Sequence, residues 1–571
     1  MNQGGKTIEL QPLSPEVFDA IPKQHFKEIQ RLSKLTGAET TVHAPLIDPA
    51  GFTKEGWSEA AREQTEEQLK SIVERSHELD PEGNIPITIH ASGIPGTEYS
   101  KPSKELIEDY KKMFQERYGR EPTQEELRKL EESQVIAINK ETGQLIPLKR
   151  EEKYYPETGK VIRVPEQEIR EVNNTEWINN ITNLTFYKKE ADEVIRNSQA
   201  NLFPLFEKLE KGKQLREEEL KRYQGAIENL KKADLFLDNV ETSFRSLYNK
   251  AYKYGDEKTR EELKQIAENW KKAAEEEKKL YQQISQGEAN PLETLKFVIK
   301  KSQLIDDTLL RLKERLIHNP PKVYEKIEDF ATKKSAETLG NVAFSAYKKY
   351  KNKAPIISIE NLYPGMAFSR ANELKNLVEN ARKEFIERAK KEGMSASEAE
   401  KAAEKLIGVT WDVGHINLLR KAGYSEEEIK KETEKIAPFV KHVHLTDNFG
   451  YGDTHLPPGM GNVPLKDILK ELEKAGFKGK KIVEAGGFVQ HFKTTPTPYI
   501  LEALGSPLYT AMMQPYWNQI RSTYGNYFSY PLAYFPEQHF SIYGSSFSAL
   551  PVELGGQMPG KQSRMTGTPT A

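Results

Sequence analysis

Two short stretches decide the fold class of this chain, GVTWDVGH (residues 408–415) and KHVHLTDN (residues 441–448). Each contains an apolar run of the kind that forms a buried strand, with histidine and aspartate at or near its end. The polar surface of the chain relies on Lys, Arg, Asp and Glu, which make up 30% of the residues, whereas histidine occurs only eleven times. Histidine and aspartate at the ends of apolar runs therefore indicate a site that binds metal or moves protons.

The same alternation of strand and helix extends over two regions, residues 1–100 and 354–490. We expect strands at apolar runs that are separated by helical segments and that read TIEL, ETTVHAP, NIPITIHASG, APIISIEN, LIGVTWDVGH, FVKHVHLTDN and KKIVEAGG. Parallel strands that alternate with helices place their carboxyl ends on one face, and the active sites of α/β barrels lie on that face.

Residues 101–353 interrupt this rhythm with Lys/Glu-rich amphipathic segments. Apolar residues recur there at helical spacing, but no heptad is sustained, so we expect an antiparallel helical bundle rather than a long coiled coil. Residues 135–165 are the exception, because their alternating runs and ETG turns predict a small β-hairpin.

Residues 491–571 form a C-terminal extension rich in Tyr, Phe, Pro, Gly and Ser. We expect its last 30 residues to be flexible or to form an extended arm that packs on another surface. The chain thus divides into a first barrel part (1–100), a helical insertion (101–353), a second barrel part (354–490) and this extension.

Composition excludes several classes of site. The chain has no cysteine, which rules out disulfides, thiolate metal ligands and cysteine nucleophiles. Its formal net charge of −2 argues against a basic field for nucleic acid over the whole chain. The N-terminus lacks the pattern of a signal peptide, and no run of about 18 apolar residues occurs. We therefore expect a cytoplasmic protein with no membrane partner.

Nine side chains with nitrogen or oxygen donors lie at the predicted strand ends or in the loops that follow: His43, His90, Glu360, Asp412, His415, His444, Asp453, His455 and Glu484. Such a set suits a divalent metal, Zn²⁺ first, with Mn²⁺, Fe²⁺ or Co²⁺ as alternatives. Because a catalytic metal needs three or four protein ligands, the set allows one to three ions, and adjacent metals serve phosphoester hydrolysis well.

Each of these side chains also has a purely structural interpretation. His442 and His444 lie two residues apart, so both point to one face of a strand, where His442 is more simply a core histidine. Glu360 and Glu484 could be buried carboxylates paired with Lys or Arg. The histidines of the first barrel part could be ordinary strand-end residues, and Asp453 and its neighbours could form turns.

The ordered motifs VHAPL, IHASG, ISIEN, WDVGH, HVHLTDN, DTHLPPGMGN and IVEAGG resemble those of the xylose-isomerase-like barrel superfamily. This superfamily includes endonuclease IV (AP endonuclease family 2) and sugar-phosphate isomerases and epimerases. The resemblance implies an α/β fold, a TIM (β/α)8-type barrel interrupted by a large, mainly α-helical insertion. It also implies three metal sites, held by His43, His90 and Glu360, by Glu360, Asp412, His444 and Glu484, and by His415, Asp453 and His455.

The sequence departs from endonuclease IV at several points. Asp447 is followed by Asn448 and Phe449 where an Asp-Ser-Lys type sequence is expected, and this form is closer to the isomerases and epimerases. The loop LIDPAGF (residues 46–52) lacks the expected DNA-intercalating tyrosine. The insertion splits the third and fourth strands, and the candidates for an eighth strand are GGFVQHF and TPYILEAL.

Three functions stay open at this point. The first is metal-dependent phosphoester hydrolysis at a sugar phosphate or abasic nucleic acid site, as in DNA repair, with Glu360 and Glu484 as catalytic residues. The second is a one-metal sugar or sugar-phosphate isomerase or epimerase that uses Glu360, Asp412, His444 and Glu484. The third is a non-enzymatic protein that binds a protein partner through the helical insertion. The oligomeric state is left open.

Overall fold

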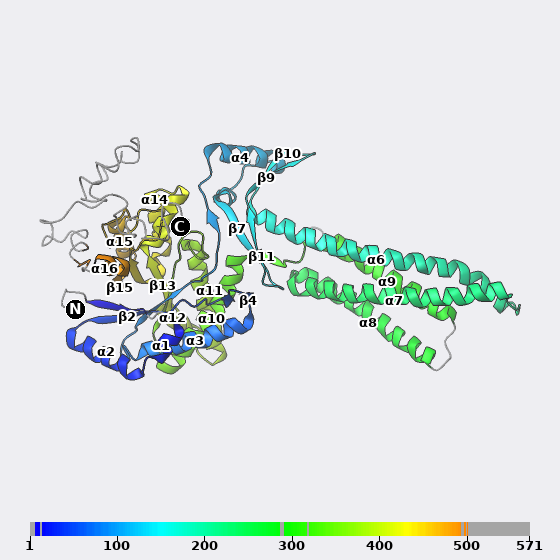
Figure 1. The fold of residues 1–571 in the computed structure, drawn as a ribbon, viewed down its shortest axis with the longest axis horizontal. Helices are drawn as coiled ribbons and strands as arrows, with labels where there is room; N and C mark the ends of the chain where they lie inside the picture. Colours follow the sequence, from blue (N-terminus) through cyan, green and yellow to red (C-terminus); the bar gives the residue numbers. More distant parts are fainter. Residues whose placement is uncertain are drawn as a thin grey trace, which may run out of the picture. The chain divides into compact units, whose positions relative to one another are not determined.

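The structure is a computed structural model, and it describes residues 6–11, 14–285, 291–316, 319–492, 496–497 and 500. The chain folds into two compact units (Figure 1). The first comprises residues 1–138, 143–165 and 326–571, and the second comprises residues 139–142 and 166–325.

A parallel sheet forms the centre of the first unit. In the described residues it has seven strands in the order β1 (Thr7–Leu10), β2 (Glu39–His43), β5 (Pro86–His90), β12 (Ile356–Glu360), β13 (Ile407–Asp412), β14 (Val440–Leu445) and β15 (Lys480–Val483). Every neighbouring pair is parallel. The two edge strands, β1 and β15, lie next to each other, so the sheet nearly closes on itself. The predicted barrel with a helical insertion is confirmed.

Helices surround this sheet: α1 (Pro15–Ala20), α2 (Lys23–Thr36), α3 (Glu59–His77), α10 (Ile327–Tyr350), α11 (Ala371–Lys391), α12 (Ala396–Leu406), α13 (Val413–Asn417), α14 (Glu426–Ile436), α15 (Leu465–Lys474) and α16 (Gly486–Phe492). Apolar residues at helical spacing, such as Leu374, Leu377 and Phe385 of α11, face the core and are fully buried. Helices α10 and α11 approach closely at Gly340, where a Cβ would lie 2.7 Å from the Cβ of Glu384.

Of the two candidates for an eighth strand, only GGFVQHF lies wholly within the described residues. GGFVQHF forms helix α16, so the strand interpretation of that segment was wrong. A short apolar run does not distinguish a strand from a helix by itself, and this run has a single β-branched residue, Val489. Most of TPYILEAL (497–504) lies outside the described residues.

The first unit also carries part of the predicted insertion. Helices α4 (Lys104–Tyr118) and α5 (Gln124–Arg128) are followed by two antiparallel strand pairs, β7 (Glu132–Asn139) with β8 (Leu145–Lys149), and β9 (Glu151–Tyr155) with β10 (Gly159–Arg163). These pairs occupy the segment for which a hairpin was predicted. Tyr110 and Phe114 of α4 bury their rings against Leu130, Ile162 and Val164.

The second unit contains four long helices, α6 (Pro165–Glu210), α7 (Glu217–Tyr254), α8 (Glu257–Ser285) and α9 (Pro291–Leu316). Its apolar core includes Trp177, Leu237 and Phe244. Two lysines are also buried there. The ammonium of Lys188 binds Asp192 and Asp306, and that of Lys301 lies 2.6 Å from Asp238 and 2.9 Å from Glu277. Ion pairs between neighbouring helices restrict how the helices align along their length.

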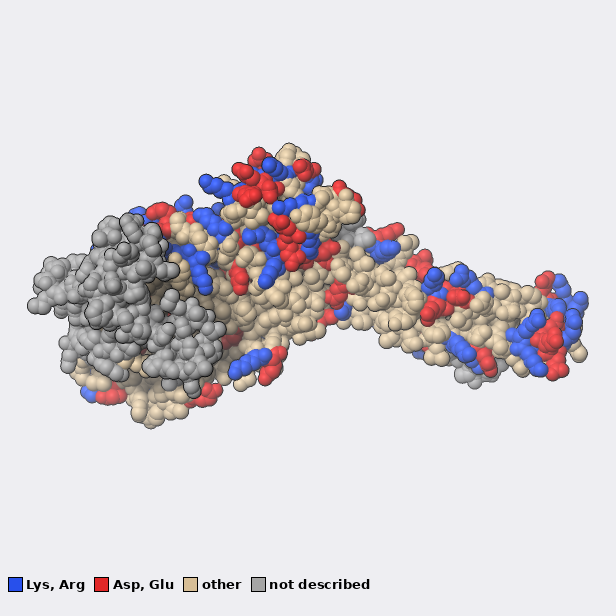
Figure 2. Space-filling view, turned by 45° about the horizontal axis from the view of Figure 1, so that its top comes forward, with Lys and Arg blue, Asp and Glu red and all other residues tan. Residues whose placement is uncertain are grey.

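On the face of this helical unit that Figure 2 shows, Lys and Arg side chains are interspersed with Asp and Glu. That face therefore offers no continuous basic patch of the kind that follows a nucleic-acid backbone. Over the described part of the chain, no helix combines the length and the apolar character needed to cross a membrane.

Candidate metal centre

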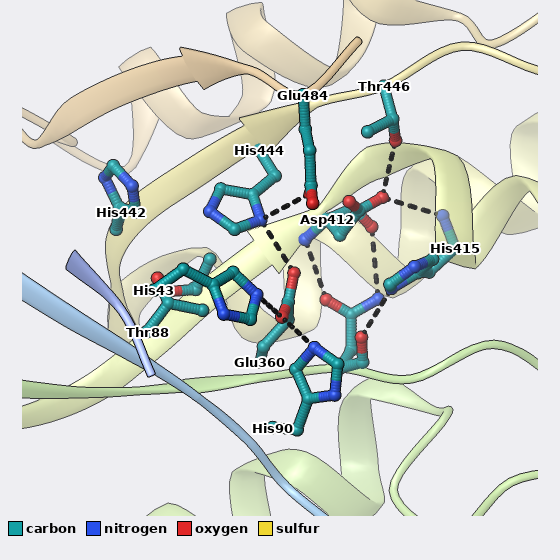
Figure 3. Close-up of polar contacts among 12 residues, drawn as sticks. His43, Thr88, His90, Glu360, Asp412, His415, His442, His444, Thr446 and Glu484 are labelled. Carbon is teal, nitrogen blue, oxygen red and sulfur yellow. Dashed lines mark hydrogen bonds and ion pairs between the residues drawn. The ribbon is translucent and has the colours of Figure 1, made fainter. Parts of the chain in front are cut away.

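The carboxyl ends of the barrel strands bring most of the predicted ligands together. His43, His90, Glu360 and Asp412 are the last residues of β2, β5, β12 and β13. His444 lies one residue before the end of β14, and Glu484 follows β15 directly. Since the strands are parallel, all six side chains lie at the same end of the barrel, and Figure 3 shows them converging.

Glu360 is the centre of the first group of contacts. Its Oε2 atom lies 3.2 Å from Nε2 of His43 and 3.1 Å from Nε2 of His90. Its Oε1 atom lies 2.7 Å from Nδ1 of His444. The carboxylate is only 1% exposed, so the three imidazoles take the place of water around it. Glu360 thereby joins two groups of donors, as expected for a bridging ligand.

Asp412 and Glu484 complete the second group. Nδ1 of His444 lies 3.2 Å from Oε2 of Glu484. Donor atoms of Glu360, Asp412, His444 and Glu484 all lie within 4.8 Å of one another. Oδ1 of Asp412 accepts hydrogen bonds from the backbone of α13 and from Thr446, but its buried Oδ2 has no hydrogen-bond partner among the described residues. An unpaired carboxylate oxygen in such a group is an open position for a cation.

A third group lies beside the first two. His415, on α13, is 3.3 Å from Oδ2 of Asp453, and His455 is 3.0 Å from the same atom. Their donor atoms also lie within 4.8 Å of one another. Nδ1 of His455 is 3.7 Å from Oε2 of Glu484, which connects this group to the second.

The loop that carries Asp453 and His455 is held by Asp447. The Asp447 carboxylate accepts hydrogen bonds from the backbone N–H groups of Asn448, Gly459 and Val463, at 2.8 to 3.0 Å. His455 itself has a φ of 45°, in the left-handed region that a residue with a Cβ adopts at a cost. A fixed loop therefore maintains a strained residue in the site.

Backbone carbonyls orient two of the histidines. Nδ1 of His43 lies 2.8 Å from the carbonyl oxygen of Ala44, and Nδ1 of His415 lies 2.8 Å from that of Asn361. A carbonyl only accepts, so Nδ1 donates in both cases. In the neutral imidazole the lone pair is then on Nε2, the atom that faces the carboxylates, as a metal ligand requires.

The electrostatics of the first two groups couple histidines to carboxylates. Burial alone would lower the pKa of His444, but the charge of Glu360 and the carboxylates that accept its hydrogen bonds raise this pKa well above its ordinary value. Burial alone would raise the pKa of Glu360, whereas His444 and His43 lower it well below its ordinary value. The metal-free site thus holds protons in positions where a divalent cation could supply the positive charge instead.

The third group behaves in the same way. Burial opposes the charged form of His455, but the hydrogen bond to Asp453 and the charge of that carboxylate raise the pKa of His455 to about 9. The pKa of Asp453 is lowered, because its hydrogen bonds with His415 and His455 outweigh the effect of burial.

A cavity of about 370 Å³ opens onto these groups. It is lined by Gln11, His43, Ala44, Pro45, Leu46, His90, Glu360, Leu362, Tyr363, His415, Asp453, His455 and Glu484. Seven of the nine predicted ligands line this cavity, and the other two, Asp412 and His444, belong to the second group. A donor set of only nitrogen and oxygen, with an unpaired buried carboxylate oxygen, fits a divalent cation.

Sequence reasoning missed one member of this region, Glu9 on β1. Its carboxylate lies 2.9 Å from Nε2 of His444 and 3.0 Å from Nε2 of His442, and it accepts a hydrogen bond of 2.8 Å from Thr41. The signal in the sequence was weak, a single acidic residue between the apolar residues of a four-residue strand. His442 is fully buried, as a core histidine would be.

Comparisons with known proteins show which family and which proteins this barrel is similar to. The family described as xylose isomerase-like TIM barrel matches residues 355–502. An uncharacterized protein of Methanocaldococcus jannaschii is 38% identical over 80 residues, which cover 14% of this chain and 26% of that protein. The fructoselysine 3-epimerase of Shigella flexneri is 30% identical over 78 residues, which cover 14% of this chain and 27% of the enzyme. The chain thus spans about a quarter of the length of these curated relatives.

Among solved structures, the chain is similar to a D-tagatose 3-epimerase-like protein, with a TM-score of 0.20 and 23% sequence identity. That similarity covers 28% of this chain and 48% of the other. The described part of the chain thus combines seven parallel strands and groups of donors at their carboxyl ends with a match to the xylose isomerase-like TIM barrel family over residues 355–502.

Proposed function

We propose that this protein is a divalent-metal-dependent isomerase or epimerase that acts on a sugar or sugar derivative. One observation carries the proposal: the carboxylates of Glu360 and Glu484, from strands on different sides of the barrel mouth, converge on the same nitrogen of His444, at 2.7 and 3.2 Å. Two carboxylates around one position can remove a proton from a carbon and return a proton to it or to its neighbour. The similarity to a fructoselysine 3-epimerase supports this reaction class.

Glu360, Asp412, His444 and Glu484 would hold the cation. When bound, the cation would polarise substrate oxygens next to the carbon that loses its proton, and so make that carbon more acidic. Of the two glutamates, Glu484 reaches the cavity more openly, with 19% of its side chain exposed against 1% for Glu360. Its pKa is lowered, because hydrogen bonding to His444 outweighs burial, so at neutral pH it is ionised and can accept a proton.

The cavity suits a substrate of monosaccharide size. Its volume of about 370 Å³ lies at the lower end of the range for small-molecule sites. Gln11, His90 and Tyr363 in its lining supply polar atoms for hydroxyl groups, and Leu46 and Leu362 supply apolar contacts.

The test is exchange of a carbon-bound proton with solvent. The metal-supplemented protein is incubated in D₂O with ketohexoses and with fructoselysine, and NMR follows deuterium entry at the sugar carbons. We expect deuterium in the wild type and a loss of about 100-fold or more in Glu484→Gln and Glu360→Gln. Glu63→Gln, an exposed change on α3, serves as the matched control and should retain the wild-type rate. Absence of exchange with a metal-loaded wild type would remove the support for this reaction.

A second candidate function is phosphoester hydrolysis at a sugar phosphate, such as an abasic nucleic acid site. It is favoured by the third group, His415, Asp453 and His455, because a reaction that needs one metal leaves this group without a role. Metal content per chain by mass spectrometry distinguishes the two. More than one ion in the wild type, with a decrease in both His415→Ala and His455→Ala, favours hydrolysis. A single ion, unchanged in both variants, favours the isomerase.

A further inference from the structure

A second polar cluster lies inside the barrel, on the side of His444 away from the metal centre. The carboxylate of Glu9, on β1, contacts side chains of β2 and β14 there. Its Oε2 atom lies 2.8 Å from the hydroxyl of Thr41 and 3.0 Å from Nε2 of His442, and its Oε1 atom lies 2.9 Å from Nε2 of His444. Residues Glu9 and Thr41 are direct partners in the register of β1 and β2. A buried carboxylate is stable only with such donors, and Thr41 and His442 supply them to Oε2.

His444 is therefore held through both ring nitrogens. Nδ1 faces Glu360 and Glu484, and Nε2 faces Glu9. Nδ1 is hydrogen-bonded to Oε1 of Glu360 at 2.7 Å, and the ion-pair contact between Nε2 and Glu9 places a second carboxylate behind the ring. The two contacts together fix the direction in which Nδ1 points to the metal centre.

We propose that Glu9 is a positioning residue of the metal centre, which fixes the ring orientation of His444. The inference rests on the proposed function only in that a metal binds at Nδ1. Thr41 and His442 hold the carboxylate of Glu9 in place, so the cluster works as a rigid support for one ligand. Partners of this kind, behind a ligating histidine, commonly contribute 10- to 100-fold to metal affinity.

The alternative is that Glu9 merely joins β1 to β14 across the barrel. Glu9→Gln and Thr41→Val separate the two roles, because both remove a hydrogen bond in the same layer but only the first removes the carboxylate from His444. Zinc affinity is measured by competition with a chelating dye, folding by thermal denaturation, and the environment of the His444 ring by ¹⁵N NMR of its nitrogens in the zinc-free and zinc-loaded protein.

We expect Glu9→Gln to weaken zinc binding by about 10- to 100-fold and to shift the ring-nitrogen signals of His444 in the zinc-loaded protein. Thr41→Val should bind zinc close to the wild-type affinity. If Glu9→Gln fails to fold, Glu9→Asp keeps the charge at a shorter reach, and its zinc affinity should fall below that of Thr41→Val.

Wild-type zinc affinity and unchanged His444 ring-nitrogen signals in Glu9→Gln would overturn the inference, as would equal losses of zinc affinity in Glu9→Gln and Thr41→Val. A wild type that binds no zinc would overturn it together with the proposed metal dependence. A wild type that binds zinc and shows the Glu9 effect, but exchanges no sugar proton, would leave Glu9 in its role and remove the proposed reaction alone.

Discussion

Metal affinity at the group of His415, Asp453 and His455 should depend steeply on pH. A cation binds the neutral imidazole, and the pKa of His455 is raised to about 9 by Asp453 against the effect of burial. At pH 7 the ring is about two pH units below this pKa, so it carries its proton in about 99% of molecules. Displacing that proton costs about 2.7 kcal/mol at 1.36 kcal/mol per unit, which corresponds to affinity about 100-fold weaker than above pH 9.

The assay is competition between the protein and a chelator for Mn²⁺ or Co²⁺, at intervals from pH 7 to pH 9.5. Each titration is corrected for protonation of the chelator. We expect affinity at this group to rise by at least about 10-fold per pH unit up to about pH 9. Burial would lower the pKa of His415, but Asp412 and Asp453 raise it, so its proton must be displaced as well. His455→Ala should bind the metal more weakly, and the number of protons that it releases on binding should be smaller by about one. His25→Ala, an exposed change on α2, should follow the wild type.

The raised pKa of His455 also determines how the stability of the metal-free protein changes with pH. Because the folded pKa of His455 exceeds its ordinary value of 6.5, its contribution to stability is fully present below pH 6.5 and is lost as the pH rises through about 9. An affinity for the metal that is flat between pH 7 and pH 9 would refute the reasoning, because the imidazole would then be neutral already.

Three further predictions concern helix α13, the barrel and the helical unit. Gly414→Ala would place a Cβ 2.1 Å from Oγ1 of Thr446, so α13 must shift, and chelator competition should show a loss of metal affinity of about 10-fold. Burial would raise the pKa of Glu432, but Arg370 lowers it to about 2, so a stabilisation of about 3 kcal/mol is present above pH 4.5 and lost as the pH falls towards 2. In Glu432→Gln the melting temperature should fall less between pH 7 and pH 3 than in the wild type, and an equal fall would contradict this role of Glu432. Lys301→Ala leaves the surrounding carboxylates without their buried cation and should destabilise the helical unit by about 3 kcal/mol; a melting temperature equal to that of the wild type would show that the cation contributes little.

The barrel and the convergence of the candidate ligands were predictable because they depend on local order in the sequence. Each ligand such as Glu360 or Asp412 follows an apolar run directly, and parallel strands bring such positions to one end whatever lies between them. His415 was also accessible, since it lies three residues after Asp412 at the start of a short helix.

Glu9 was not predictable in the same way. Its partners His442 and His444 lie more than 430 positions away, and no local pattern distinguishes a carboxylate that supports a ligand from one that faces solvent. Helix α16 was missed for a different reason, because seven residues with one buried aromatic ring, Phe488, carry too little periodicity to separate helix from strand. A role of the helical insertion in binding a protein partner stays a prediction.

The insertion between β5 and β12 has a consequence for synthesis on the ribosome. His90 ends β5, but Glu360, which its ring contacts at 3.1 Å, emerges only after residues 91–355 have been made. At about 5–20 residues per second, this delay is on the order of 10 to 50 s, during which one edge of β5 lacks its neighbouring strand. The long helices in the interval form through local contacts and can fold during that time, which shortens the stretch of flexible chain between the two strands. Assembly of the candidate metal centre is therefore a late event, and a nascent chain halted within the insertion would expose an unpaired strand edge and lack the carboxylate of Glu360.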